Sequence, residues 1–208
     1  MKRQALLIGG GLAVTAYILG TSATADITGS LHDFSGQVWS QNQICLPCHA
    51  PHHAEAAEAG MLWNHTVTTA AYQIYGGDGA TFPVDEALDQ KSILCMSCHD
   101  GTVAVDAFGG LGGTFVIAGR GNLGTDLQND HPVGRAAVYP THAGYFDPAT
   151  WENTAGFGFA LADMDVDGEL ERVVSCATCH EPHNRNDNEF FLWVDNDGSQ
   201  LCLTCHNK

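Results

Sequence analysis

The chain has few basic residues, no cysteine outside one repeated motif and no long apolar run after residue 25. Lysine and arginine total 8 against 24 aspartates and glutamates, so the formal net charge of the 208 residues is −16. A surface this acidic repels nucleic acid and anionic lipid, and we expect neither as a partner. A membrane helix needs about 20 apolar residues, so we expect no membrane span after residue 25.

The N-terminus has the pattern of a secretory signal peptide. Lys2 and Arg3 precede an apolar stretch at 5–19, and the small residues Ala23 and Ala25 occupy the positions expected before a cleavage site. We therefore expect a signal peptide at 1–25 and a secreted protein at the cell surface or outside the cell, with the periplasm as the alternative location. An uncleaved N-terminal anchor stays open.

All eight cysteines belong to four Cys-X-X-Cys-His motifs, at 45–49, 95–99, 176–180 and 202–206. This motif is the attachment signature of c-type haem, in which two thioether bonds fix the porphyrin and the histidine binds the iron. We expect four covalent haem c groups. The cofactor-binding cysteines are Cys45, Cys48, Cys95, Cys98, Cys176, Cys179, Cys202 and Cys205. The proximal iron ligands are His49, His99, His180 and His206.

Two other uses of eight cysteines compete with haem. A secreted chain could pair them as disulfides, and Cys-X-X-Cys pairs could hold structural zinc. Neither use explains why a histidine follows the second cysteine of every motif.

The motifs are arranged as a duplicated unit. In each half a histidine precedes a motif that continues as His-x-Pro-His, and a second motif follows. This order predicts two dihaem units, at 26–125 with a glycine-rich linker at its end, and at 126–208.

Seven histidines lie outside the motifs, and four bis-histidine irons would need four of them. The repeat nominates the distal ligands His32, His52, His131 and His183, with His65 as the substitute. Outside the signal peptide and motifs, methionine offers only Met61 and Met164. Without the methionine ligand that raises haem potential, we expect low potentials.

The spacing also suggests which motif each distal histidine serves. His183 follows the motif histidine His180 by three residues and cannot reach the opposite face of the same haem. We therefore assign His183 to the fourth motif and, by the same reasoning, His52 to the second. His32 and His131 then serve the first and third motifs by exclusion, and ligation of a neighbouring subunit by His32 is an open alternative.

The expected fold is mostly irregular and loop-rich, a multihaem cytochrome c with few short α-helices and four haems forming a chain. The composition favours helices at 51–59 and 85–95, and strand signals are weak. The stretch 119–124 matches Gly-x-Gly-x-x-Gly, but it lacks the strand and helix of a dinucleotide site and is expected to be a loop.

An acidic segment offers a candidate calcium site. Asp163, Asp165 and Asp167 alternate and are followed by Gly168, as in the first half of an EF-hand loop. Val174 stands where that loop needs a bidentate glutamate, so an acidic surface turn is the competing interpretation.

Three stretches resemble the doubled-CXXCH cytochromes of metal-reducing bacteria: 98–105, 121–133 and 198–206. With four haems in this order, the chain is similar to the OmcE-type tetrahaem cytochromes. The resemblance implies polymerisation into extracellular nanowire filaments that carry electrons along stacked haems.

These observations predict an electron-transfer protein and not an enzyme. The resemblance implies a head-to-tail homopolymer whose other partners are redox proteins or extracellular electron acceptors. A monomeric periplasmic shuttle to a terminal reductase is the main alternative. A multihaem oxyanion reductase is a weaker one, because it needs an open iron position and no motif departs from Cys-X-X-Cys-His.

Overall fold

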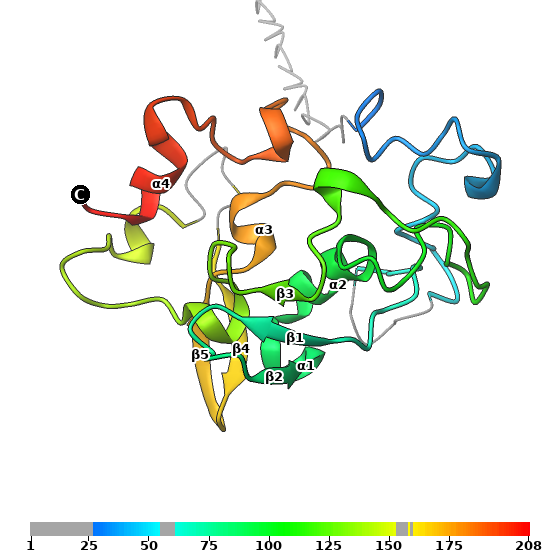
Figure 1. Ribbon diagram of the computed structural model, residues 1–208. Helices are drawn as coiled ribbons and strands as arrows, with labels where there is room; N and C mark the ends of the chain where they lie inside the picture. The colour runs from blue at the N-terminus through cyan, green and yellow to red at the C-terminus, as the bar shows by residue number, and fades with distance from the viewer. Residues whose placement is uncertain (1–26, 55–60, 153–157, 159) are drawn as a thin grey trace, which may run out of the picture.

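The computed structural model describes residues 27–54, 61–152, 158 and 160–208, most of them in loops and turns (Figure 1). The helices and strands among these residues are short, which confirms the loop-rich fold expected from the sequence. The predicted signal peptide at 1–25 and most of the helix predicted at 51–59 lie outside the described residues. Residues 51–54 are irregular.

The regular elements of the described chain are four α-helices, five strands and several short 3-10 turns. The α-helices are α1 (Val84–Ala87), α2 (Gln90–His99), α3 (Cys176–Cys179) and α4 (Gln200–Cys205). The strands are β1 (Ala71–Ile74), β2 (Thr81–Pro83), β3 (Asp126–Leu127), β4 (Ala162–Val166) and β5 (Glu169–Val173). None of the described helices is long and apolar enough to cross a membrane.

The first half of the chain is built on a three-stranded sheet with the order β2-β1-β3. β1 pairs antiparallel with β2 and parallel with β3, where Ile74 lies opposite Leu127. Tyr72 is fully buried and packs with Ile74, Leu88 and Met96, so the sheet rests on α1 and α2. The β1–β3 pairing crosses the predicted boundary at residue 125, and the division into two dihaem units stays a prediction.

The single helix predicted at 85–95 is two helices in the structure. α1 ends before Leu88, whose backbone is extended, and α2 begins after Asp89. The Asp89 carboxylate accepts hydrogen bonds from the backbone N–H groups of Lys91 (3.1 Å) and Ser92 (3.2 Å), as an N-cap residue does. The cap starts a new helix, which runs on through the second motif to His99.

Asp89 also joins α2 to α3. Its carboxylate accepts hydrogen bonds from the hydroxyls of Ser92 and Ser175, the latter at 2.9 Å. The Ser92 hydroxyl in turn accepts the backbone N–H of Cys176 at 3.0 Å. These three side chains belong to residues at most 2 % exposed, so a buried polar network holds the second motif against the third.

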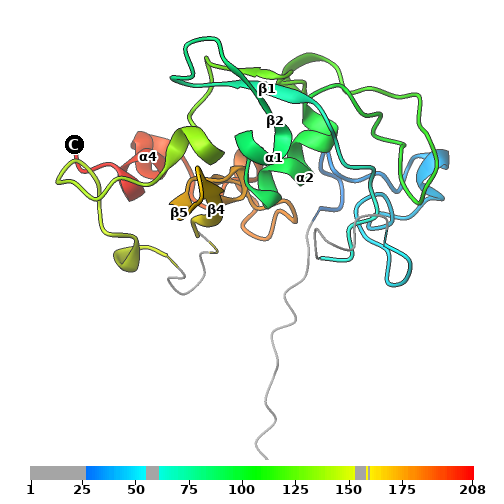
Figure 2. The ribbon, with the colours of Figure 1, turned by 90° about the horizontal axis from the view of Figure 1, so that it is seen from below.

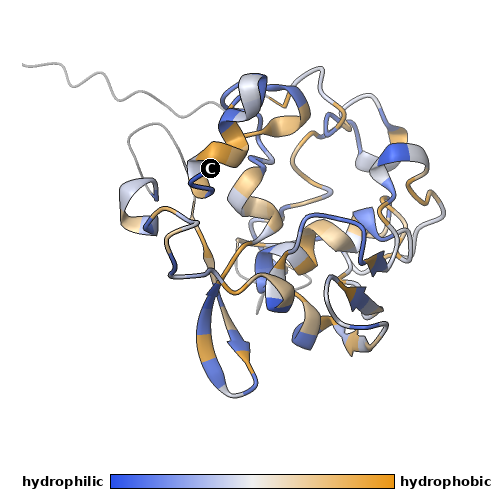
Figure 3. Ribbon diagram, turned by 60° about the vertical axis from the view of Figure 1, so that its left-hand side comes forward, coloured by the Kyte–Doolittle hydropathy of each residue, from blue (hydrophilic) through white to orange (hydrophobic). Residues whose placement is uncertain are grey.

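The acidic segment around 163–169 forms a β-hairpin. β4 and β5 pair antiparallel, with Ala162 opposite Val173. Asp167 and Gly168 make the turn with φ values of 57° and 89°, a left-handed pair typical of two-residue hairpin turns. The hairpin projects from the body with polar and apolar residues alternating along it (Figure 3).

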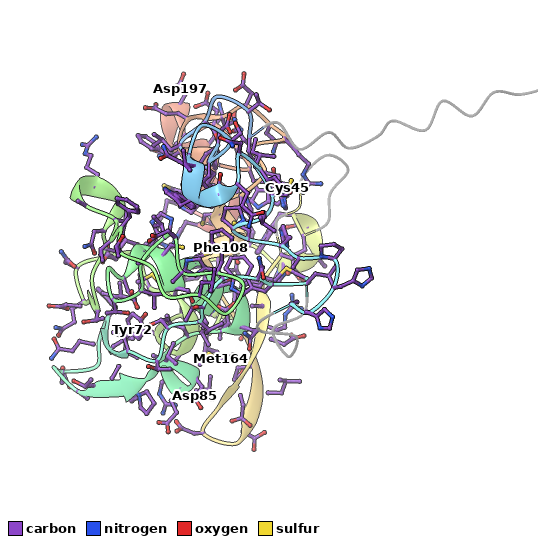
Figure 4. All side chains as sticks on the ribbon, turned by 90° about the vertical axis from the view of Figure 1, so that its right-hand side faces the viewer. Cys45, Tyr72, Asp85, Phe108, Met164 and Asp197 are labelled. Atoms are coloured by element: carbon purple, nitrogen blue, oxygen red, sulfur yellow. The ribbon has the colours of Figure 1, made fainter. Side chains whose placement is uncertain are left out.

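The N-terminal described residues, which carry the first motif, and the C-terminal residues, which carry the fourth, lie on one side of the molecule, and α3 lies centrally beside α2. In Figure 1 the N-terminal described residues and the C-terminal residues run along the top, above the sheet and the hairpin. Figure 4 likewise shows Cys45 and Asp197 in the upper part, with Tyr72 and Asp85 below. Seen from below, α4 lies at one end and the N-terminal described residues at the other (Figure 2).

The buried network makes Asp89→Ala a destabilising change. The variant loses the N-cap of α2 and leaves the Ser92 and Ser175 hydroxyls without their acceptor, so we expect the free energy of unfolding to fall by about 2–4 kcal/mol. Guanidinium unfolding of the haem-loaded protein, followed by far-ultraviolet circular dichroism, measures it. The matched control is Asp85→Ala, an exposed site in α1 where about 0.5 kcal/mol or less is expected. Equal losses in the two variants would contradict the network's role.

Candidate functional site

Each Cys-X-X-Cys-His motif forms one helical turn. The backbone N–H of the motif histidine donates to the carbonyl of the first cysteine at 2.8 Å for His49, 3.0 Å for His180 and 2.9 Å for His206, and His99 ends α2. Such a turn brings residues i, i+3 and i+4 to one face. Both thiols and the imidazole of each motif therefore lie on the same side, as attachment of one group at three points requires. No disulfide joins any of the eight cysteines, all of which lie in the described residues.

Backbone carbonyls orient three of the motif imidazoles. Nδ1 lies 2.8 Å from the Met61 carbonyl oxygen in His49, 2.7 Å from that of Gly121 in His99, and 2.8 Å from that of Phe190 in His180. A carbonyl can only accept, so Nδ1 carries the proton and donates it. Nε2 then presents its lone pair, which is the arrangement of a metal-binding histidine.

Three motif histidines face a second histidine. The ring centroids are 6.1 Å apart for His49 and His183, with an interplanar angle of 21°. They are 6.0 Å apart for His32 and His99, and 6.4 Å apart for His131 and His206. Each pair joins segments distant in the sequence.

These separations fit an iron between the rings. An imidazole nitrogen lies about 2 Å from a bound metal, and the ring centroid about 1 Å further, so two rings on opposite sides of one metal are about 6 Å apart. Burial, and then the neighbouring His99, lowers the pKa of His32, which favours its neutral metal-binding form. The residues present therefore fit haem at the first, second and fourth motifs.

The pairs differ from those expected from the spacing. His183 faces the first motif and not the fourth, His32 faces the second and not the first, and His131 faces the fourth and not the third. The reason is the path of the segment after the third motif. That segment folds back on itself, with the N–H of Glu181 donating to the Phe191 carbonyl at 2.6 Å, and carries His183 toward the N-terminal residues.

The third motif has no such pair. His180 is exposed, and none of the other ten histidines, all of them in the described residues, faces its ring in the way the three pairs do. His52, nominated as a ligand by the repeat, is exposed and lies in no ring pair of the described chain, and the same holds for its neighbour His53.

His65, the substitute ligand, is placed differently. It is 1 % exposed, and both ring nitrogens are occupied, with Nδ1 2.8 Å from the Thr66 carbonyl oxygen and Nε2 3.0 Å from that of Ala104. Nε2 also lies 3.5 Å from the Cys98 Sγ. In this position His65 packs beside the second motif and presents no free nitrogen to a metal.

Cysteines of consecutive motifs lie close together. Burial, and then the neighbouring Cys48 of the first motif, raises the pKa of the Cys98 thiol to about 12. A hydrogen bond to Cys176, together with burial, raises the pKa of Cys95. Burial, and then Cys205, raises the pKa of Cys179 to about 12. The attachment sites thus follow one another in space in their sequence order.

Sequence reasoning missed Glu181, a buried carboxylate beside these rings. Its Oε1 accepts from Nδ1 of His183 at 3.0 Å, and its Oε2 accepts from the backbone N–H of Arg185 at 2.7 Å. Burial raises the pKa of this carboxyl, but hydrogen bonds from Arg185 and His183 outweigh burial and hold the pKa below its usual value. The sequence contains one indication of a special role at this position: the second repeat has Glu181 where the first repeat has Ala50.

The candidate calcium ligands are spread along the hairpin. Asp163 pairs with Arg172 at 3.2 Å, and Asp167 pairs with Arg135 at 2.5 Å. Asp165 accepts the backbone N–H of Gly168 at 2.8 Å and lines a surface hollow with Arg135 and Asp167. Within the described part of the chain, no three acidic, histidine or cysteine side chains are placed to hold a metal ion. Calcium therefore receives no support from the geometry.

Comparison with known proteins bears on the C-terminal part of the chain. Residues 171–208, which contain the third and fourth motifs, match the family model described as the doubled CXXCH motif. No curated protein matches the chain. The match supports the resemblance to multihaem c-type cytochromes, and the motifs indicate covalent binding of haem c and a role in electron transfer.

Proposed function

We propose that the chain is a secreted tetrahaem c-type cytochrome that transfers electrons through bis-histidine irons. The observation that carries this proposal is the set of three histidine pairs with centroids 6.0–6.4 Å apart. Bound haem supplies the redox-active iron. The chain's cysteines would hold it covalently, and each pair of imidazoles would bind one iron. An iron held this way has no position for substrate, which favours electron transfer over catalysis.

The unpaired third site supports self-association. His180 is exposed in a single chain, and His52 is an exposed histidine that pairs with no other described ring. We propose that His52 of a neighbouring copy supplies the second ligand at the third motif, in place of the role that the sequence suggested for His32. Because the donor and acceptor surfaces differ, this contact is heterologous and can repeat without closing, which produces an open filament. An extracellular conductive filament is therefore the preferred role.

The exposed His180 is also compatible with two other functions, a monomeric shuttle and an oxyanion reductase. As a monomeric shuttle, the chain would leave that iron five-coordinate or ligated by a small molecule. As an oxyanion reductase, it would use the open position for substrate. The coordination of the third iron in monomer and polymer separates these roles.

We expect four covalent haems per chain, with one high-spin iron in the monomer and four low-spin irons in the polymer. Intact mass and the pyridine haemochrome count the haems, and the ferric spectrum with negative-stain microscopy reports spin state and filaments. Added imidazole should convert the monomer to fully low-spin.

The variant His52→Ala should keep four haems, lose filaments and show one high-spin iron. The control is His142→Ala, an exposed histidine that contacts Tyr145 and faces no motif histidine. A wild-type monomer that forms no polymer at any concentration and shows no substrate turnover favours the shuttle. Nitrite or similar turnover at the high-spin iron favours the reductase.

The pairing of His183 with the first motif has its own test. His183→Met should keep four haems but raise the potential of one, because methionine ligation raises haem potential. Spectroelectrochemical titration measures the change. In a chain that lacks the first haem (Cys45→Ser with Cys48→Ser), the same substitution should leave the other three potentials unchanged. A shift that persists in that background would place His183 at another iron.

A further inference from the structure

Glu181 is the one acidic residue buried against a histidine of the described pairs. Its side chain is 2 % exposed, and its Oε1 lies 3.0 Å from Nδ1 of His183. The backbone N–H of His183 donates to the same oxygen at 3.2 Å. Two hydrogen bonds therefore fix the carboxylate to the residue whose ring faces His49.

Arg185 holds the other side of the carboxylate. Its backbone N–H donates to Oε2 at 2.7 Å, and its Nε lies 3.3 Å from the same atom. The Arg185 guanidinium also lies over the Trp193 ring, 5.2 Å from its centroid. Glu181 thus has a fixed orientation, with Oε1 directed at the imidazole.

Four of the other five paired imidazoles meet a different kind of acceptor. Nδ1 of His49 and Nδ1 of His99 face neutral backbone carbonyls at 2.8 and 2.7 Å. Nδ1 of His131 lies 3.0 Å from the Pro132 carbonyl oxygen, and that of His32 lies 3.5 Å from the Pro182 carbonyl oxygen. Among these described contacts, only His183 donates to a charged group.

The acceptor matters for the electronic character of the ligand. A carboxylate attracts the Nδ1 proton more strongly than a carbonyl, because hydrogen bonds to an ionised acceptor are roughly twice as strong. The imidazole gains electron density at Nε2 and becomes a better donor to a metal. A stronger donor, with a buried negative charge behind it, stabilises the ferric state over the ferrous state.

We propose that Glu181 is a positioning residue that lowers the reduction potential of the haem at the first motif relative to the other haems. It acts through its hydrogen bond to His183 and rests on the proposed function, in which His183 and His49 share one iron. The first repeat has Ala50 at the position of Glu181. Only His183, in the second repeat, therefore has a carboxylate at this position to accept its Nδ1 proton. The first site would then hold an electron for the smallest fraction of the time.

The test is Glu181→Gln in the full haem-loaded chain. Glutamine keeps the shape but removes the charge, so one of the four midpoint potentials should shift to a more positive value while three stay. The electron paramagnetic resonance signal of one low-spin ferric haem should change with it. The matched control is Glu189→Gln, which removes an exposed charge from the same loop and should leave all four potentials in place.

A second variant covers the case in which Glu181→Gln fails to fold. Arg185→Gln removes the competing guanidinium charge and leaves the backbone donor in place, so it strengthens the pull of Glu181 on the His183 proton and should shift the same potential to a more negative value. Unchanged potentials and resonance signals in a folded Glu181→Gln chain would overturn the proposal. If His183→Met also leaves every potential unchanged, the proposed ligation itself has failed. If His183→Met shifts one potential and Glu181→Gln does not, only the role of Glu181 is rejected.

Discussion

Two imidazoles on opposite sides of one metal lie about 6 Å apart, and the described chain brings three pairs of histidines to this separation. Each of the three pairs ties a one-turn motif to a loop with little regular structure of its own. His32, His131 and His183 all sit outside helices and strands. In the proposed cytochrome, bonds to iron replace much of the packing that a helix bundle would provide. Long runs of secondary structure are then unnecessary, which agrees with helices of ten residues or fewer.

The regular structure that does exist is concentrated where the motifs meet. The network around Asp89 and Ser175 is buried between α2 and α3, and the sheet supports α2 from its other side. A hydrogen-bonded network in a water-poor interior is costly to disturb, because each lost partner leaves another polar group unpaired. The second and third motifs are therefore held by polar contacts within the protein, in addition to any bond to a cofactor.

The sequence alone predicted the loop-rich character and nominated three histidines that face a motif ring, but it also nominated His52, which faces none in the described chain. It could not predict which histidine faces which motif, because the repeat gives order along the chain and not the path of the loops. It missed the break at Leu88, where an N-cap aspartate interrupts a stretch of good helix formers. It left the acidic segment open between a calcium loop and a turn, and the Asp167–Gly168 turn made that segment a hairpin. The repeat shows that glutamate replaces Ala50 at position 181, but the burial of Glu181 and its contact with His183 depend on the path of the loop.

The contact between the N-terminal residues and the loop after the third motif has a consequence for the order of maturation. The His32 ring lies 3.5 Å from the Pro182 carbonyl, a separation of 150 residues along the chain. Contacts between such distant residues form late, since a long loop must first close. In the proposed secreted cytochrome, the first motif would emerge during export well before its partner His183. Haem attached there early would wait with one axial face exposed to solvent, so a truncated chain would carry its cofactors and still be immature.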